Sequence, residues 1–89
     1  MLSFPIDPLP KLRRLPATLP AEGAVRIELQ EGIPVLRASA SVHQRIATLL
    51  RKQEDSRLSA DEMEELEGYE EIDDYLSFLN RIVRNLLQG

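Results

Sequence analysis

Apolar and polar residues follow several patterns along the chain, and each pattern predicts a different backbone conformation. Residues 24–30 alternate, with Val25, Ile27 and Leu29 on one side and polar residues between them. A period of two is typical of a strand that buries one face. A Glu31-Gly32 turn signal and a second apolar run follow. The segment therefore predicts a β-hairpin whose first strand buries these three side chains.

The second strand of this hairpin, residues 33–37, contains Pro34. Proline has no backbone N–H and cannot donate to a central ladder, so we expect this strand at an edge of the sheet. Two strands alone are only marginally stable in water. The hairpin therefore needs helices packed against it, or the same hairpin from a second copy of the chain.

A first helix is predicted over residues 41–53, where apolar residues recur at helical spacing. Ser41 and Gln44 have the spacing of a capping box, which would make Ser41 the N-cap. Ser39 is a competing N-cap. A polar break then separates this helix from the last segment of the chain.

The last segment, residues 59–87, predicts one long helix that is acidic at its start and apolar toward its end. Ser59 and Glu62 have capping-box spacing, and acids in the first turns suit the positive end of the helix dipole. Gly68 either bends the helix or marks a close contact. One stripe suffices to bury a helix face, and it consists of Met63, Leu66, Tyr69, Ile72, Leu76, Leu79, Val83 and Leu86. A second row widens the apolar surface of the C-terminal half with Tyr75, Phe78, Ile82 and Leu87.

Five of the six prolines lie within residues 1–20, which excludes a helix or a central strand there. Apolar residues recur between these prolines and predict an extended arm, either lying over its own domain or gripping another subunit. We therefore expect a single α+β domain. A proline-rich arm over residues 1–22 precedes a short β-hairpin and two helices, the second long, over residues 23–89.

The net charge of −4 conceals an asymmetry, because residues 1–52 carry +4 and residues 53–89 carry −8. A basic front and an acidic back suggest two binding polarities or self-association. The core of an 89-residue chain is small, and no cysteine is present to cross-link it. Oligomerisation is then the expected means of stabilisation, most simply as a homodimer. Without a signal-peptide pattern or a membrane-spanning run, we expect a cytoplasmic protein with no membrane partner.

The residues offer no catalytic constellation, and we expect a non-enzymatic protein without a cofactor. His43 is the only histidine, and carboxylates along a solvated helix lack the cleft that raises a catalytic pKa. The four glycines are isolated and form no phosphate-binding loop. Glu67, Glu70, Glu71 and Asp74 have helical spacing, but without a calcium-loop pattern a solvated face is the better interpretation than a metal site.

Nucleic-acid binding is an open alternative. A basic cluster in the arm and two arginines in the hairpin could contact backbone phosphates, which require only positive charge. The strand-helix-helix order resembles that of ribbon-helix-helix repressors, although the second helix is too long and too acidic for a close match. The candidate nucleic-acid contacts are Lys11, Arg13, Arg14, Arg26 and Arg37.

Protein binding is the function that the sequence favours. A wide apolar helical face with tyrosines is what helix-in-groove recognition uses. The alternative is that both apolar rows pack within the chain's own domain. The candidate partner-binding residues are Tyr69, Ile72, Tyr75, Leu76, Phe78, Leu79, Ile82 and Val83.

The motifs Leu58-Ser59, Tyr69-Glu70 and Ile72-Asp-Asp-Tyr-Leu76 occur within residues 25–87. With them the chain resembles small uncharacterised bacterial proteins, frequent in cyanobacteria, that combine a helix, an LS/LT-x-x-E cap and an acidic stretch. Such proteins often carry proline after the position of Ser39, where this chain has Ala40. The resemblance implies an antitoxin-like protein. Together with the wide apolar helical face, it favours a module that docks on a toxin or nuclease through the C-terminal helix, with DNA contact through the basic N-terminal half as an open addition. A structural homo-oligomerisation or scaffold module without a toxin partner is the alternative.

Overall fold

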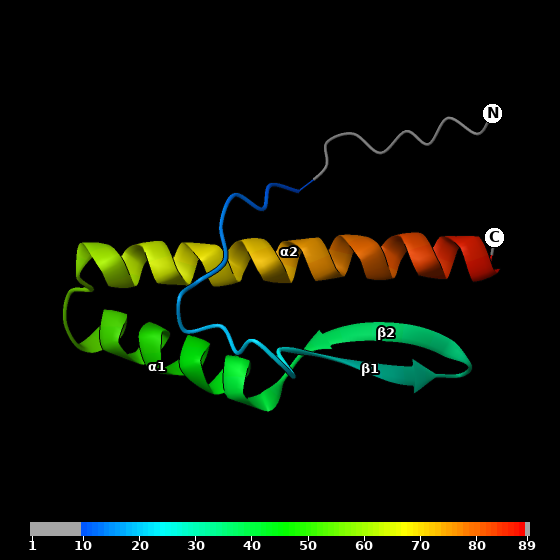
Figure 1. Cartoon of the computed structure of the whole chain (residues 1–89), viewed down its shortest axis with the longest axis horizontal. Helices are drawn as coiled ribbons and strands as arrows, with labels where there is room; N and C mark the ends of the chain where they lie inside the picture. The colour runs from blue at the N-terminus through cyan, green and yellow to red at the C-terminus, as the bar shows by residue number, and fades with distance from the viewer. Residues whose placement is uncertain (1–9, 89) are drawn as a thin grey trace.

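The computed structural model describes residues 10–88, and it confirms a β-hairpin followed by two helices, the second long. The elements are β1 (Val25–Gln30), β2 (Ile33–Ala38), α1 (Ala40–Asp55) and α2 (Ala60–Gln88). Figure 1 shows α1 alongside the first half of α2 and the hairpin alongside its second half. The long helix therefore supports both smaller elements.

The hairpin closes through the predicted Glu31-Gly32 turn. Both residues have positive φ, 55° and 82° respectively, as a two-residue type I′ turn requires. The strands pair antiparallel, with Ile27 opposite Leu36 and Leu29 opposite Pro34. Residues directly opposite one another point to the same face, so the register fixes which side chains share a surface.

The N-cap of α1 is Ser39, and the predicted cap at Ser41 is wrong. The Ser39 side chain accepts a hydrogen bond from the Val42 backbone N–H at 3.4 Å, so the helix begins at Ala40. The competing cap prevails because Ser39 follows the last residue of β2 in extended conformation, which is the usual backbone conformation of an N-cap residue. Ser41 lies inside the first turn and contacts the Ser39 hydroxyl.

The predicted capping box at the start of α2 is confirmed. The Glu62 N–H donates to the Ser59 hydroxyl at 3.1 Å, and the Ser59 N–H donates to the Glu62 carboxylate at 2.9 Å. This exchange satisfies two backbone donors that would otherwise lack partners at the helix start. It also holds the short connection from α1 in a fixed turn.

The core lies between α1, the start of α2 and the end of β2. Its most deeply buried side chains are Tyr69, Leu49 and Val42, which come from both helices. Apolar residues at helical spacing on the two helices therefore supply much of the core, although Met63 and Leu86 of the predicted stripe are exposed. The remaining buried members of this cluster are Ala38, Leu58, Leu66 and Ile72.

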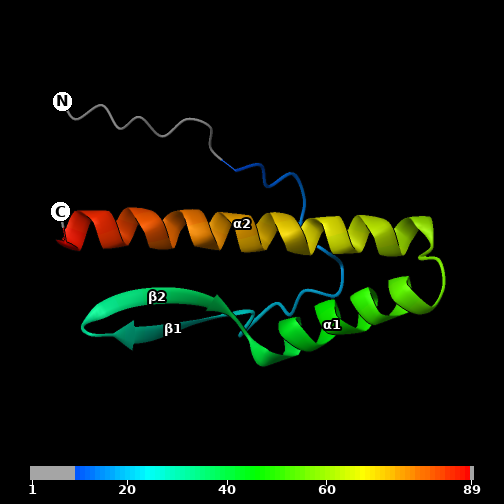
Figure 2. The same ribbon diagram turned by 180° about the vertical axis from the view of Figure 1, so that it is seen from behind.

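Residues 10–24 contain neither helix nor strand and cross α2 on their way to β1 (Figures 1 and 2). Pro16 is buried against Gly68 of α2, where an added Cβ would lie 3.0 Å from the Pro16 Cγ. Gly68 thus marks a close contact, one of the two roles expected for it. The predicted arm of residues 1–22 lies partly outside the described residues, since the description begins at Pro10.

None of the described helices combines the length and the apolar character needed to cross a membrane.

Candidate protein-interaction surface

The hairpin exposes the side chains that the sequence predicted to be buried. Val25, Ile27 and Leu29 retain 42%, 68% and 73% of their accessible surface, and no residue of β1 is buried. We call these three side chains the apolar row. Its exposure contradicts the expectation of a half-buried first strand, and it leaves branched aliphatic side chains in water.

Helix α2 explains this exposure, because it packs along the edge of β2 and not across the sheet. The Asn80 side-chain oxygen accepts a hydrogen bond from the Leu36 N–H at 2.7 Å, and its NH₂ group donates to the Leu36 carbonyl at 2.9 Å. In this arrangement β2 lies between α2 and β1 (Figure 1). The helix can therefore bury Val35 of β2 without reaching the apolar row.

The backbone of β1 has an open edge on the side away from β2. The Leu36 backbone groups point toward Asn80, so Leu36 and Ile27 form a pair without hydrogen bonds between them. The N–H and C=O groups of Ile27 consequently point outward, as do those of Val25 and Leu29 two residues away. Among residues 10–88 no hydrogen bond reaches these outward groups. We call them the open edge.

The opposite face of the hairpin combines the buried Val35 of β2 with a group of ion-paired charges. Glu28 accepts contacts from Arg26 at 3.2 Å and from Arg37 at 2.6 Å. Arg26 and Arg37 lie directly opposite one another, so the carboxylate of Glu28 offsets their repulsion. The hairpin thus presents one apolar face, one face on which ion-paired charges surround Val35, and one open edge.

The predicted partner-binding residues of α2 divide into two groups. Tyr69, Ile72 and Phe78 are buried in the single chain, and the first two belong to the core cluster. The others are partly exposed, so part of the predicted surface remains accessible: Tyr75, Leu76, Leu79, Ile82 and Val83. The apolar surface also extends to the helix end, where Leu86 and Leu87 are 63% and 60% exposed.

Phe78 lies about 160° around α2 from Asn80, on the side away from the hairpin edge. Its ring meets the Tyr75 ring edge-on with 6.2 Å between centroids, and the Arg81 guanidinium lies 6.0 Å from its centroid. Such contacts favour a fixed ring orientation. Two members of the second apolar row, Tyr75 and Phe78, therefore contact one another directly.

Most of the predicted nucleic-acid contacts are neutralised by carboxylates of the same chain. Arg13 pairs with Glu71 at 2.8 Å, and Arg14 pairs with Glu64 at 2.9 Å. Arg26 and Arg37 share Glu28, as described above. Among residues 10–88, Lys11 is the one candidate of the five without an ion pair. The structure therefore does not bring these residues together as one positive patch.

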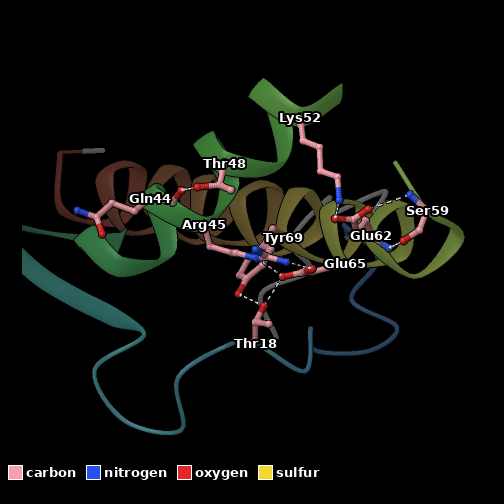
Figure 3. Close-up of polar contacts among 9 residues, drawn as sticks. All are labelled: Thr18, Gln44, Arg45, Thr48, Lys52, Ser59, Glu62, Glu65 and Tyr69. Carbon is pink, nitrogen blue, oxygen red and sulfur yellow. Dashed lines mark hydrogen bonds and ion pairs between the residues drawn. The ribbon is translucent and has the colours of Figure 1, made fainter. Parts of the chain in front are cut away.

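A cluster of polar contacts joins the arm, α1 and α2 (Figure 3). Arg45 of α1 donates two hydrogen bonds to the Glu65 carboxylate, at 2.6 and 2.8 Å. The Thr18 hydroxyl donates to Glu65 as well, so it accepts from the Tyr69 hydroxyl at 2.8 Å. The hydroxyl of the buried Tyr69 is thereby satisfied. We interpret the cluster as a clamp that holds three segments together.

The carboxylates of these contacts are stabilised in their charged form. The hydrogen bonds from Arg45 lower the pKa of Glu65, and the same contact raises the pKa of Arg45. Hydrogen bonds from Lys52 and from the Ser59 backbone lower the pKa of Glu62 to about 2. The backbone and side chain of Arg13 lower the pKa of Glu71. All three shifts move away from the neutral range in which an acid-base catalyst operates.

Metal binding has no geometric support in the described part of the chain. Residues 10–88 contain no group of three or more His, Cys, Asp or Glu side chains placed to hold a metal ion. Of the four acids that share helical spacing, Glu71 is engaged by Arg13. His43 is exposed at the start of α1, and a shallow depression beside it includes Asp73 and Asp74.

Two features of this surface were not predicted from the sequence. The exposure of the apolar row has no local signal, because its alternation is the same whether the face is buried or open. Asn80 did carry a signal: it is a polar residue one helical turn from both Leu76 and Val83, within the apolar stripe. A polar side chain that is partly buried among apolar neighbours requires a partner, which here is the edge of β2.

Comparison of the chain with protein-family models, curated proteins and solved structures finds no match to any of the three.

Proposed function

We propose that this chain is a non-enzymatic protein-interaction module that binds protein by adding a strand to the open edge of β1. The observation that carries the proposal is the coincidence of the apolar row with the open edge on one strand. Backbone groups supply affinity in strand addition, and alternate side chains supply specificity. The open edge and the apolar row offer both.

The composition of β1 supports this function further. Exposed edge strands are usually protected by charged side chains, especially lysine, by proline, by a bulge or by a covering segment, since they otherwise pair with other chains. The strand VRIELQ contains neither proline nor lysine, and its pairing with β2 is continuous. Its two charged side chains, Arg26 and Glu28, are paired with one another on the face opposite the apolar row. An edge without proline, lysine, a bulge or a covering segment is suited to pairing with a strand of another chain.

The state of the acidic residues supports the non-enzymatic part of the proposal. A carboxylate that acts as an acid or base near neutral pH needs a raised pKa. The three carboxylates within residues 10–88 whose pKa values are perturbed, Glu62, Glu65 and Glu71, are shifted downward by cationic partners. Their role is to hold segments together, as in the clamp around Thr18.

A cross-linking experiment in the native host tests this function. A photoreactive residue replaces Leu29 at the open edge, and a matched variant carries it at Ala47, an exposed position on α1. Irradiation should join the first variant, but not the second, to a protein in one discrete product. A Leu29 variant that stays at the 10.1 kDa mass of the single chain contradicts the proposal, as does equal labelling from both positions.

A second candidate function is the antitoxin-like role, with α2 as the docking surface. Its support is the resemblance over residues 25–87 together with the exposure of Leu86 and Leu87 and the partial exposure of Tyr75 and Ile82. Tyr75→Ala combined with Ile82→Ala should abolish binding to the toxin encoded beside this chain, while Asp73→Ala on the same helix should not. Retained binding in the double variant removes this candidate.

A further inference from the structure

We propose that the occupant of the open edge is a second copy of this chain, whose β1 pairs antiparallel with the first about a two-fold axis through Ile27. The inference rests on the proposed strand addition and identifies its partner. The two hairpins would form one four-stranded sheet with the order β2-β1-β1-β2. Each copy contributes the same surface, as a two-fold interface requires.

The backbone allows only a few registers for such a pair. The outward N–H and C=O groups belong to Val25, Ile27 and Leu29, so hydrogen bonds form only when these residues lie opposite one another. One register centres on Ile27, with Ile27 opposite itself and Val25 opposite Leu29 of the second copy. The two neighbouring registers shift one strand by two residues in either direction.

The charges between these positions select the register centred on Ile27. There Arg26 lies opposite Glu28 of the second copy, and Glu28 lies opposite Arg26 of the second copy. A shift in one direction places Arg26 opposite Arg26, and a shift in the other places Glu28 opposite Glu28. Opposite charges directly across a pair stabilise it, and like charges destabilise it. Both pairs are of the kind without backbone bonds, in which side chains approach most closely.

The apolar row supports the same register. Ile27 packs beside Ile27 of the second copy, and each Val25 packs beside a Leu29. Six aliphatic side chains then form one continuous surface, and lateral contacts remove part of each exposed side chain from water. In the single chain the same side chains are the largest exposed apolar groups of the hairpin.

The second strand has room to approach. No described element lies beyond β1 on the side away from β2 in either view (Figures 1 and 2). In the register centred on Ile27, the turn of the second copy approaches Gly23, since Glu31 then lies opposite it. A Cβ added at Gly23 would meet no atom within 4 Å, so this end of the edge is open.

Charge exchange between two variants tests the register. In Arg26→Glu alone and in Glu28→Arg alone, every cross-copy pair becomes a like-charge pair, so we expect sedimentation to show about tenfold weaker self-association. An equimolar mixture of the two variants restores opposite charges and should form a heterodimer. The double variant R26E/E28R should dimerise like the natural chain. Arg51→Glu, on the exposed side of α1, is the matched control and should leave dimerisation unchanged.

Two readouts guard against loss of folding. Heterodimer formation in the mixture shows that both single variants remain folded. Amide hydrogen exchange provides an internal control, because the Arg26 and Glu28 amides are already bonded to β2 in the single chain. The amides of Val25, Ile27 and Leu29 should gain protection only as the protein concentration rises through the dimerisation range.

Three results would overturn the inference. The first is a strict monomer at millimolar concentration. The second is a dimer whose self-association is equally strong in the natural chain, in Arg26→Glu and in Glu28→Arg. The third is a dimer in which the Val25, Ile27 and Leu29 amides stay unprotected, which places the contact elsewhere. If the chain is monomeric and Leu29 cross-links to a different protein in the host, the self-pairing fails while the proposed function stands. A monomer without any Leu29 adduct contradicts both.

Discussion

The side-chain amide of Asn80 bonds to both backbone groups of Leu36 and so takes the place of a third strand beside β2. A primary amide offers the same donor and acceptor as a peptide group, which is why it can satisfy a strand edge. This contact holds α2 along one edge of the hairpin. It therefore decides that β2 is covered and that β1 is open.

Replacing Asn80 with alanine should lower the free energy of unfolding by about 2 kcal/mol, because it leaves the Leu36 N–H and C=O without their protein partners. In a domain of this size that corresponds to a fall of roughly 10 °C in the melting temperature. Urea unfolding followed by circular dichroism measures the change. Asn85→Ala on the exposed side of the same helix is the control and should have a far smaller effect. Equal losses in both variants would mean that the Leu36 contact does not stabilise the fold.

Replacing Gly68 with alanine should not stabilise the chain, although alanine is favoured over glycine in a helix by about 1 kcal/mol. The new methyl group would lie 3.0 Å from the Pro16 Cγ, so the arm must move to admit it. In a Pro16→Ala background, Gly68→Ala should raise the free energy of unfolding, because the arm no longer opposes the added methyl group. Thermal unfolding of the four proteins of this cycle measures the coupling. Additive effects would show that Pro16 does not restrict this position.

The cap of α1 can be tested by comparing two serines. Ser39→Ala should lower the free energy of unfolding by about 1 kcal/mol, because the Val42 N–H loses its acceptor. Ser41→Ala should cost much less, since Ser41 lies inside the helix and alanine is a better helix former. Chemical denaturation of both variants distinguishes them. A larger loss at Ser41 would restore the capping box that the sequence suggested.

The ion pairs of Glu62, Glu65 and Glu71 predict a loss of stability in acid. The pKa of Glu62 falls from 4.5 unfolded to about 2 folded, and Glu65 and Glu71 shift in the same direction. A group with a depressed folded pKa contributes its stability fully above the unfolded pKa and loses it as the pH falls through the folded pKa. The free energy of unfolding should therefore decrease as the pH falls below about 4.5, and the Glu62 contribution should vanish near pH 2. Urea unfolding across this range measures it, and a flat profile would contradict the ion pairs.

A single substitution isolates the Glu62 shift. Lys52 supplies its largest cause, a hydrogen bond of 2.6 Å to the Glu62 carboxylate. Lys52→Gln should therefore raise the pKa of Glu62 toward 4.5 in a carboxyl NMR titration. Arg51→Gln, which removes a neighbouring charge without a contact to Glu62, should change it far less.

Much of the fold could be predicted because its signals are local. The Glu31-Gly32 turn, the capping box of Ser59 and Glu62, and the helical stripe through Tyr69 each depend on residues a few positions apart. Local geometry is fixed by local sequence, so these elements formed as expected. The sequence alone does not decide the cap of α1, because Ser39 and Ser41, two positions apart, compete for the same role.

The candidate site could be predicted only in part, because exposure depends on what packs against an element. The helix stripe placed Tyr69 and Ile72 on an apolar face, but only the packed structure shows that this face belongs to the core. The basic residues were identified correctly as charged, yet their carboxylate partners lie as far away as the 58 positions between Arg13 and Glu71. Sequence spacing carries no information about such contacts.

The sequence by itself determined the order of the elements, their turns and caps, and the alternation that gives β1 one apolar and one charged face. The tertiary structure alone decided that the apolar face lies open to solvent. The physical reason is the contact between Asn80 and Leu36, which spans 44 positions and holds α2 at the edge of β2 instead of across the sheet. The periodicity of Val25, Ile27 and Leu29 fixes which side chains share a face, and the position of α2 determines whether that face is covered.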